Sequence, residues 1–141
     1  MSARNNVCTP LLSVAVVVNY IVYQAYIMVT IYHNPRCSKS RETLALLREK
    51  GIEPTIVEYL KTPLNADQLR QLFAQANLSV REAMRTGEDE YKELQLADDS
   101  LSDDELLAAI EKHPRLMNRP FVVTEKGARL CRPVEIVNEI L

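Results

Sequence analysis

The chain has 141 residues, of which 47% are hydrophobic and 26% are charged, and its formal net charge is −2. These values are typical of one soluble globular domain with its own core. The acidic residues between positions 88 and 105 argue against a general nucleic-acid surface, and three irregularly spaced cysteines suggest a reducing compartment. We therefore expect a cytoplasmic protein with no nucleic-acid partner.

Residues 1–27 differ in composition from the rest of the chain. Residues 11–27 are mostly Val, Ile, Leu, Ala and Tyr and carry no charge, as a membrane helix would. However, polar residues and a preceding proline interrupt the run, no linker separates it from the next strand, and no small-x-small cleavage site follows. We favour Met28 as the true start. Residues 1–27 would then be an upstream mis-start, and residues 28–141 would be the domain. We expect contact with a membrane only if residues 1–27 are translated and insert into it.

The first predicted elements are a strand and a helix with Cys37 between them. Residues 29–32 are β-branched or aromatic, as in a short strand, and apolar residues at helical spacing then continue towards Gly51. Residues 54–59 alternate in the manner of a second strand. Cys37 therefore lies at a strand-loop-helix junction.

Three helices are predicted in the middle of the chain from their capping patterns. In each, an Asn or Ser is followed three residues later by Gln or Glu, so that the two side chains can bind backbone N–H groups at a helix start. The pairs are Asn65 with Gln68, Ser79 with Glu82, and Ser102 with Glu105. The last of these helices should end at Pro114.

A hairpin and a helix are predicted at the carboxyl end. Residues 121–124 and 129–131 are typical of two strands joined by a four-residue turn, and Pro133 suits the first position of a closing helix to Leu141. The complete order is strand, helix, strand, helices, hairpin and helix. This order predicts a thioredoxin-like α/β fold, with a mixed sheet and a helical insertion.

Cys37 is the centre of the predicted site. Arg36, Lys39 and Arg41 surround it at a helix start, where backbone N–H groups already carry about half a positive charge, so an anion is expected there. The same field should lower the pKa of the Cys37 thiol, and His33 is near enough to add a charge or a hydrogen bond. A lone cysteine is often a buried apolar residue and a basic helix start is often a solvated face. Their combination with an Asn-Pro turn favours a reactive thiolate.

Spacing excludes several cysteine chemistries. A Cys-x-x-Cys pair would need cysteine where Ser40 stands, and a tyrosine-phosphatase loop would need arginine where Thr43 stands. No paired Cys or His spacing suits zinc, so we expect no metal. Cys131 lies in a predicted strand, where a small apolar side chain is a better interpretation than a resolving thiol. The electrons for a redox step must therefore come from another molecule.

Two arginines meet at the open end of the predicted hairpin. If Thr124 faces Gly127, Arg119 lies opposite Arg132, and like charges facing each other across two strands are unfavourable. Each arginine precedes a proline, which holds its backbone extended. The pair suits a tetrahedral oxyanion, with two solvated surface arginines as the alternative interpretation.

These features together resemble the glutaredoxin-dependent arsenate reductases of the thioredoxin-like superfamily, and the resemblance covers residues 28–141. The matching motifs are His33-Asn34-Pro35-Arg36-Cys37-Ser38-Lys39-Ser40-Arg41-Glu42-Thr43, Ser79-Val80-Arg81-Glu82-Ala83-Met84-Arg85, His113-Pro114 to Asn118-Arg119-Pro120, and Leu130-Cys131-Arg132-Pro133. The sequence departs from the best-known members at Arg36, Ser38 and Lys39, which leaves the preferred oxyanion open.

The resemblance implies a role for each matching residue. Cys37 would be the nucleophile, and His33 would favour its thiolate. The oxyanion would be bound by Arg85, Arg119 and Arg132. The loop around the cysteine would be supported by Asn34, Ser38, Ser40, Arg41 and Pro120, with a cis bond before the proline. From the residues alone, Arg85 cannot be chosen over Arg81.

The activity that the resemblance implies is reduction of arsenate to arsenite. The Cys37 thiolate would attack arsenate, glutathione would attack the adduct as co-substrate, and glutaredoxin would restore the thiol, with no bound cofactor. One alternative is a redox-responsive regulator of the Spx type or another partner-binding module, although many such regulators carry a Cys-x-x-Cys switch that Ser40 precludes. Another alternative is a glutathione-dependent monothiol oxidoreductase that acts on mixed disulfides.

Overall fold

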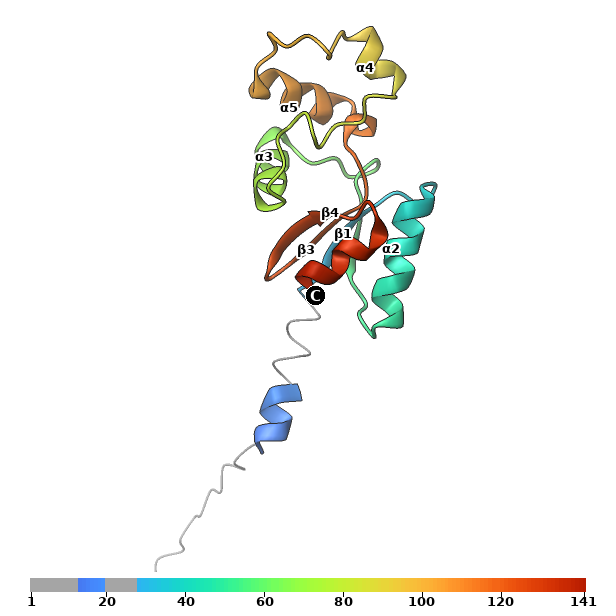
Figure 1. Ribbon diagram of the computed structural model, residues 1–141, viewed down its shortest axis with the longest axis vertical. Helices are drawn as coiled ribbons and strands as arrows, with labels where there is room; N and C mark the ends of the chain where they lie inside the picture. Colours follow the sequence, from blue (N-terminus) through green and yellow to red (C-terminus); the bar gives the residue numbers. More distant parts are fainter. Residues whose placement is uncertain (1–12, 20–27) are drawn as a thin grey trace, which may run out of the picture.

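The structure, a computed structural model, describes residues 13–19 and 28–141. Residues 14–19 form a short helix with exposed side chains (Figure 1). Among the described residues, no helix is both long and apolar enough to cross a membrane. The interpretation of residues 1–27 as a mis-start stays a prediction, because most of that segment lies outside the described residues.

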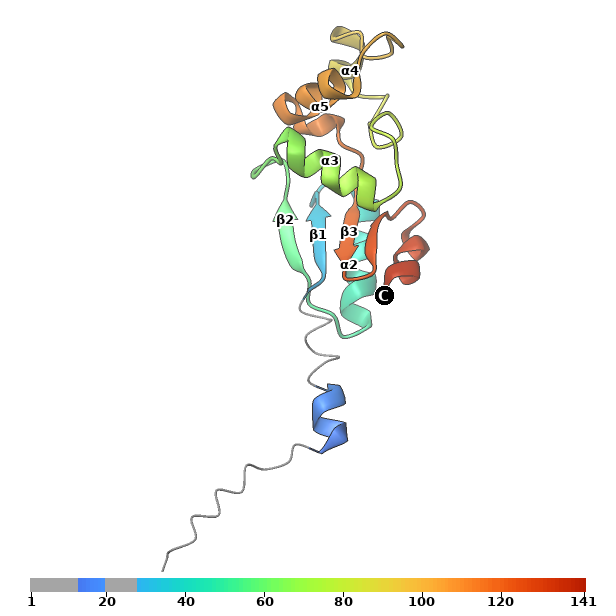
Figure 2. The same cartoon turned by 90° about the vertical axis from the view of Figure 1, so that its left-hand side faces the viewer.

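Four strands form one mixed sheet in the order β2-β1-β3-β4 (Figure 2). They are β1 (Thr30–His33), β2 (Thr55–Glu58), β3 (Phe121–Thr124) and β4 (Gly127–Leu130). β1 runs parallel to β2 and antiparallel to β3, and β3 and β4 form a hairpin. Thr124 pairs with Gly127, which confirms the predicted register. Just beyond the strands, the Cys131 N–H donates to the Pro120 carbonyl at 2.9 Å and continues that pairing.

Helices cover both faces of the sheet, because alternate strand residues point to opposite sides. The α-helix α2 (Ser38–Glu49) and the 3₁₀ helix η2 (Val134–Ile140) share one core with Ile31 and Val122. α3 (Ala66–Gln75) covers the other face, where Phe121 is buried, and α5 (Asp103–Lys112) packs on α3. Figure 2 shows α3 in front of the sheet and α2 behind it. These layers confirm the predicted α/β architecture.

A helical insertion lies between β2 and β3. It holds α3, α4 (Asp89–Glu93), α5 and the 3₁₀ helix η1 (Pro114–Leu116), and it extends beyond one end of the sheet (Figure 1). Two of the predicted helix starts are confirmed, because Asn65 forms a reciprocal capping box at α3 and Ser102 forms one at α5. The insertion therefore ends where the chain re-enters the sheet at β3.

The predicted helix at Ser79 is wrong, although its capping pattern is present. The Glu82 N–H donates to the Ser79 hydroxyl at 3.2 Å, and the Ser79 N–H donates to the Glu82 carboxylate at 2.8 Å, yet residues 80–83 form only a turn. The reason is tertiary pairing: the Arg85 N–H donates to the Leu116 carbonyl at 2.8 Å, so this backbone is withdrawn from a helix. This departure brings Arg85 beside the segment that leads to β3.

The carboxyl end differs in detail from the prediction. The closing element is a 3₁₀ helix from Val134 to Ile140, and Pro133 caps it from outside instead of occupying its first position. β4 runs from Gly127 to Leu130, so the turn after β3 has two residues instead of the predicted four, and Cys131 lies just after the strand instead of within it. The bond before Pro120 is cis, as expected, and the bond before Pro133 is cis as well, which was not expected.

Candidate active site

Cys37 is held at the junction between β1 and α2. It is the N-cap residue of α2, with extended backbone angles, and its own N–H donates to the Asn34 carbonyl at 3.0 Å. Its carbonyl accepts from the Arg41 N–H at 3.0 Å, which is the first hydrogen bond of the helix. The residue is only 8% exposed. The sulfur therefore faces the free N–H groups of the first helical turn from a largely buried position.

The pKa of the Cys37 thiol lies below its ordinary value. Burial raises the pKa, but the Ser40 N–H, the Arg119 guanidinium and the Lys39 N–H together outweigh that effect. The expected direction is confirmed, but its source is only partly the predicted one. The Lys39 ammonium pairs with Glu42 at 3.1 Å on the surface, so Lys39 acts on the sulfur through its backbone.

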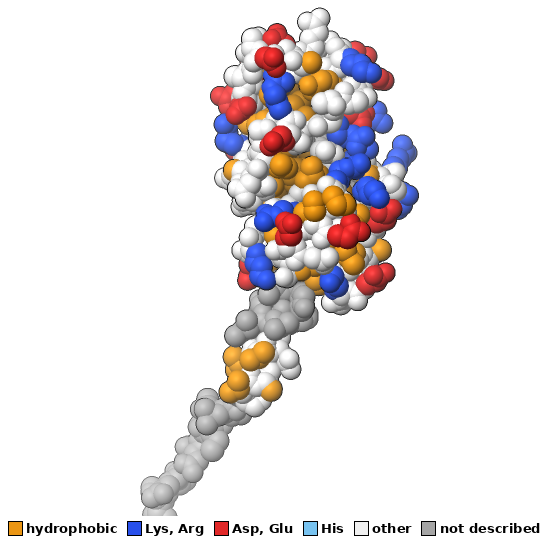
Figure 3. All heavy atoms as spheres, viewed as in Figure 1, with side chains coloured by type: hydrophobic (Ala, Val, Ile, Leu, Met, Phe, Trp, Pro, Cys, Tyr) orange, Lys and Arg blue, Asp and Glu red, His pale blue; other side chains and the backbone are white. Residues whose placement is uncertain are grey.

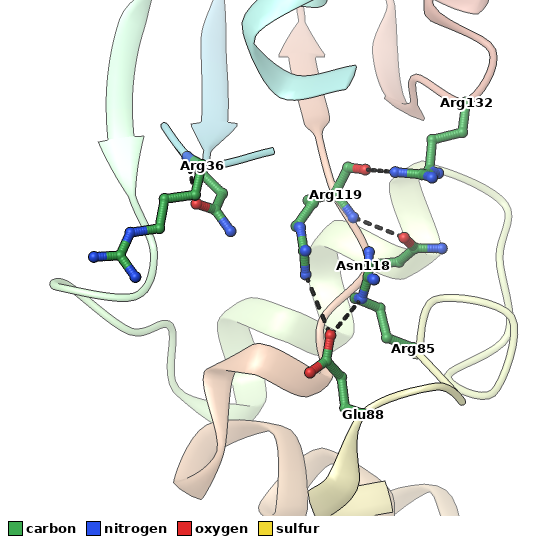
Figure 4. Close-up of polar contacts among 7 residues, drawn as sticks. Arg36, Arg85, Glu88, Asn118, Arg119 and Arg132 are labelled. Atoms are coloured by element: carbon green, nitrogen blue, oxygen red, sulfur yellow. Dashed lines mark hydrogen bonds and ion pairs between the residues drawn. The ribbon is translucent and has the colours of Figure 1, made fainter. Parts of the chain in front are cut away.

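The other two predicted cations are also directed elsewhere. The Arg41 guanidinium donates to the Pro35 carbonyl at 2.9 Å and fastens the loop. Figure 4 shows the Arg36 side chain on the opposite side of the site from Arg132. The charge beside the sulfur thus comes from Arg119, which precedes β3, and not from the cations nearest in sequence.

A buried hydrogen-bond chain supports the loop. The Ser40 hydroxyl accepts from the Asn34 N–H at 3.0 Å and is joined to His33 Nδ1 at 2.7 Å, and the Asn34 side chain accepts from the Arg36 N–H at 3.0 Å. Burial lowers the pKa of His33, Glu58 opposes this effect, and Arg48 and Arg41 add to it. His33 therefore favours its neutral form and contributes a hydrogen bond to Ser40 instead of a charge.

Three arginines from separate segments converge near this loop. The Arg85 Nε–H donates to Glu88 Oε1 at 2.9 Å, and a terminal nitrogen of Arg119 lies 3.7 Å from the same oxygen. A terminal nitrogen of Arg132 donates to the Arg119 carbonyl at 3.1 Å (Figure 4). The structure thus brings together all three arginines that the resemblance indicated. Cation-rich geometry of this kind can hold a tetrahedral oxyanion beside a nucleophile.

Sequence reasoning gave no role to three residues of this site. Asn118 accepts the Arg119 N–H through its side chain at 3.0 Å and orients that backbone. Glu88 lies between Arg85 and Arg119, and Tyr59 is fully buried close to Asn34 and Arg119. The only sequence signal for Glu88 was its spacing three residues after Arg85, and Tyr59 was simply the end of a predicted strand.

Two buried polar atoms of the site have no hydrogen-bond partner among the described residues. They are the Tyr59 hydroxyl and Arg119 Nε. Burial raises the pKa of Tyr59, Arg119 and Asn34 oppose that rise, and Cys37 adds to it, so the hydroxyl lies close to all three groups. Buried polar atoms normally find partners, and exceptions concentrate at functional sites. Their position beside Cys37 supports a polar ligand at this point.

A cavity of about 460 Å³ opens beside the loop. Its charged lining comes from Arg36, Glu58, Lys61, Glu88, Arg115 and Arg119. Figure 3 shows Lys and Arg side chains gathered where the sheet meets the helical insertion. The cavity can therefore receive a small charged molecule of either sign beside residues 33–36 of the loop that leads to Cys37.

The described part of the chain has no cluster of residues suited to a metal ion and no second reactive thiol. No group of three or more His, Cys, Asp or Glu residues there is placed to hold a metal ion. Cys131 is fully buried, and burial raises the pKa of its thiol to about 12. Such a thiol stays protonated and shielded, which supports the structural interpretation of Cys131.

The fold and the site together define a thioredoxin-like protein with a nucleophilic cysteine and an arginine cluster. A sequence profile of the ArsC family matches residues 32–140. The chain belongs to the ArsC family.

Several relatives are similar over most of their length. An arsenate reductase of Rhizobium meliloti (strain 1021) is 56% identical over 113 residues, which are 80% of this chain and 81% of the relative. The Escherichia coli (strain K12) protein named "Uncharacterized protein YfgD" is 56% identical over 114 residues, 80% of this chain and 96% of the relative. The solved structure of an arsenate reductase from Vibrio cholerae superimposes with a TM-score of 0.79 at 53% identity, covering 82% of this chain and 99% of that one.

Proposed function

We propose that this protein is an arsenate reductase in which Cys37 is the nucleophile and glutathione and glutaredoxin supply the electrons. The observation that carries the proposal is the Cys37 thiol of lowered pKa with the Arg119 guanidinium beside it and Arg85 and Arg132 close by. Relatives that are about half identical and similar in length bear the name arsenate reductase. A thiolate beside convergent arginines is what attack on an oxyanion requires.

The proposed reaction begins with attack of the Cys37 thiolate on arsenic(V). A sulfur–arsenic bond forms, and one oxygen leaves as water after taking up protons. Arg85, Arg119 and Arg132 hold the remaining oxygens and stabilise the charge that develops on them. The thiolate of glutathione then attacks the Cys37 sulfur of the adduct. A sulfur–sulfur bond forms, the sulfur–arsenic bond breaks, and its electron pair leaves with arsenic, which is released as arsenite. A thiol of glutaredoxin then attacks the glutathione sulfur of this mixed disulfide, takes over the glutathione and restores the Cys37 thiol.

The external thiol in this scheme follows from the surroundings of Cys37. Ser40 occupies the position of a local resolving cysteine, and Cys131 is buried with a strongly raised pKa. The mixed charge of the neighbouring cavity suits glutathione, which carries both carboxylates and an ammonium group. Dependence on glutathione also fits a reducing cytoplasmic location.

The supporting loop has a separate role in the proposal. Ser38 begins α2, Ser40 and Asn34 fix the backbone that presents N–H groups to the sulfur, and Arg41 fastens the loop. Pro120 stands between Arg119 and the first residue of β3. In this scheme His33 favours the thiolate indirectly, through its hydrogen bond to Ser40.

The test is arsenite production by the full chain from arsenate, with glutathione and glutaredoxin present together and omitted in turn. We expect turnover only with the complete mixture, none for Cys37→Ser, and retained turnover for Cys131→Ser. The proposal would be wrong if the folded wild-type protein can be alkylated at Cys37 by iodoacetamide and yet makes no arsenite.

A second candidate function is thiol transfer from glutathione-containing mixed disulfides. The mixed-charge cavity beside a single reactive thiol favours it, since a monothiol site is sufficient for that exchange. Arsenate separates the two functions. If arsenate is a substrate, it competes with the exchange reaction at Cys37 and yields arsenite. If thiol transfer is the true activity, exchange proceeds and no arsenite forms.

A further inference from the structure

A carboxylate lies within the arginine cluster. Glu88 Oε1 accepts from Arg85 Nε at 2.9 Å and lies 3.7 Å from a terminal nitrogen of Arg119, and Figure 4 shows it between the two side chains. The Glu88 side chain is 22% exposed, and those of Arg85 and Arg119 are 27% and 16% exposed. The contact is therefore largely shielded from solvent, unlike an ordinary surface ion pair.

The Glu88 side chain contacts the arginines and does not cap its own helix. It is the N-cap residue of α4, yet its side chain makes no capping hydrogen bond. Both of its ion contacts within the described part of the chain use Oε1. An ionised carboxylate has two oxygens and only accepts hydrogen bonds, so Oε2 can still accept from a donor. Glu88 and Arg119 line the same cavity, where such a donor would enter.

A fixed acceptor among the cations discriminates between tetrahedral oxyanions. At neutral pH, arsenate and phosphate keep at least one O–H group, whereas sulfate has none. A protonated oxyanion can place its O–H against Glu88 while the arginines bind its charged oxygens. Sulfate would bring a bare negative oxygen against the carboxylate, with no proton between them, and such repulsion is an effective way to reject a competitor.

We propose that Glu88 is a specificity-determining residue that accepts a hydrogen bond from the bound oxyanion and so selects protonated oxyanions over sulfate. This inference rests on the oxyanion site of the proposed function. Two simpler roles make different predictions. If Glu88 only aligned Arg85 and Arg119, its removal would weaken the binding of every oxyanion equally. If Glu88 only competed with oxyanions for the arginines, its removal would strengthen the binding of every oxyanion equally.

The experiment uses Glu88→Gln in the full chain. The variant keeps the shape of the side chain and removes its charge. Iodoacetamide modification of Cys37 is followed by peptide mapping, which separates this thiol from Cys8 and Cys131. Sodium arsenate, phosphate or sulfate is titrated at constant ionic strength, and the half-protecting concentration of each is measured. Asp89→Asn is the matched control, because it removes one charge from the neighbouring exposed position.

For the wild type and for Asp89→Asn, we expect arsenate and phosphate to protect Cys37 at much lower concentrations than sulfate. For Glu88→Gln, the ratio of sulfate to arsenate half-protecting concentrations should fall by at least about tenfold, the usual effect of one charged hydrogen bond. An unchanged ratio overturns the inference, whether all three anions shift together or none shifts. Equal protection by all three anions in the wild type, or no protection, also overturns it.

The outcome is separable from that of the proposed reductase activity, because protection requires no turnover. Absence of arsenite production with the selectivity intact would remove the reductase and keep the Glu88 inference. A circular dichroism spectrum of Glu88→Gln that matches the wild type shows that a changed ratio does not come from unfolding. Glu88→Ala gives a second measurement, and it too should lower the ratio, because it lacks the acceptor.

Discussion

At the Cys37 sulfur, burial and electrostatics act on the thiol in opposite directions. Burial alone would raise the pKa, and the lowered pKa depends on two backbone N–H groups together with the Arg119 guanidinium. The backbone groups come with any helix start, whereas the guanidinium depends on the fold. Arg119 is therefore the side chain whose loss should most affect the reactivity of this cysteine.

We predict that Arg119→Met raises the pKa of Cys37 and slows its alkylation at neutral pH. The substitution removes the charge and the hydrogen bond but fills a similar volume. Arg36→Met is the control, since Arg36 is nearer in sequence but does not contribute to lowering the pKa. The measurement is the pH dependence of Cys37 modification by iodoacetamide. Equal shifts in the two variants would show that general positive charge, and not this contact, activates the thiol.

The buried Tyr59 hydroxyl should lower the stability of the folded protein. It is buried close to Asn34 and Arg119 but forms no hydrogen bond of good geometry among the described residues, and leaving such a group unpaired costs about 1–3 kcal/mol. Tyr59→Phe should therefore raise the free energy of unfolding by about 1 kcal/mol, whereas Tyr32→Phe, at a half-buried position, should change it by less than about 0.5 kcal/mol. Urea denaturation followed by circular dichroism measures both. A stability loss in Tyr59→Phe would contradict the reasoning.

Among the elements, one capping pattern gives two different results. It opens helices at Asn65 and Ser102, where an amphipathic run follows, but at Ser79 it closes only a turn. The two hydrogen bonds between Ser79 and Glu82 are the predicted ones, so the capping pattern itself was predicted correctly. The helix fails because the backbone near Arg85 pairs with the segment before β3, and this pairing joins residues far apart in sequence.

This difference predicts unequal costs for removing the two serine hydroxyls. Ser102→Ala should lower the free energy of unfolding by about 1 kcal/mol, because it leaves the first turn of a ten-residue helix without its cap. Ser79→Ala should cost less than about 0.5 kcal/mol, because its exposed turn is held by the pairing of the residues that follow. Chemical denaturation of both variants against the wild type provides the measurement. Equal losses would indicate that the Ser79 turn depends on its cap after all.

At the scale of the molecule, the sheet explains what the sequence could and could not predict. Strand and hairpin patterns suggested the register that the structure shows, and this register places Arg132 against the backbone of Arg119. Arg85 was indicated only by resemblance, because it follows a segment that forms a turn and not the predicted helix. Tyr59 carried no local signal, and Glu88 carried only its spacing after Arg85, since the contact of Glu88 with Arg119 depends on the fold. Patterns of period two and of capping are local, whereas the charge balance of a site is not.

The core beneath this site contains Cys131, whose titration should affect the stability of the whole molecule at alkaline pH. Burial raises the pKa of its thiol from an ordinary value of 9.0 to about 12. Between these values the unfolded chain binds fewer protons than the folded one, so the free energy of unfolding falls as pH rises. The full contribution is present below about pH 9 and is lost progressively towards pH 12.

We predict that Cys131→Ala flattens this decline, by up to about 1.4 kcal/mol per pH unit relative to the wild type. Cys37→Ala is the matched control, because the lowered pKa of Cys37 leaves that thiol ionised in both states above about pH 9. The raised pKa values of Tyr32 and Tyr59 add the same slope to the wild type and to Cys131→Ala and cancel between these two proteins. Free energies of unfolding from urea titrations between about pH 8 and about pH 11 give the three slopes. Parallel slopes for the wild type and Cys131→Ala would mean that this thiol reaches solvent, and Cys131 would then have to be reconsidered as a resolving thiol for Cys37.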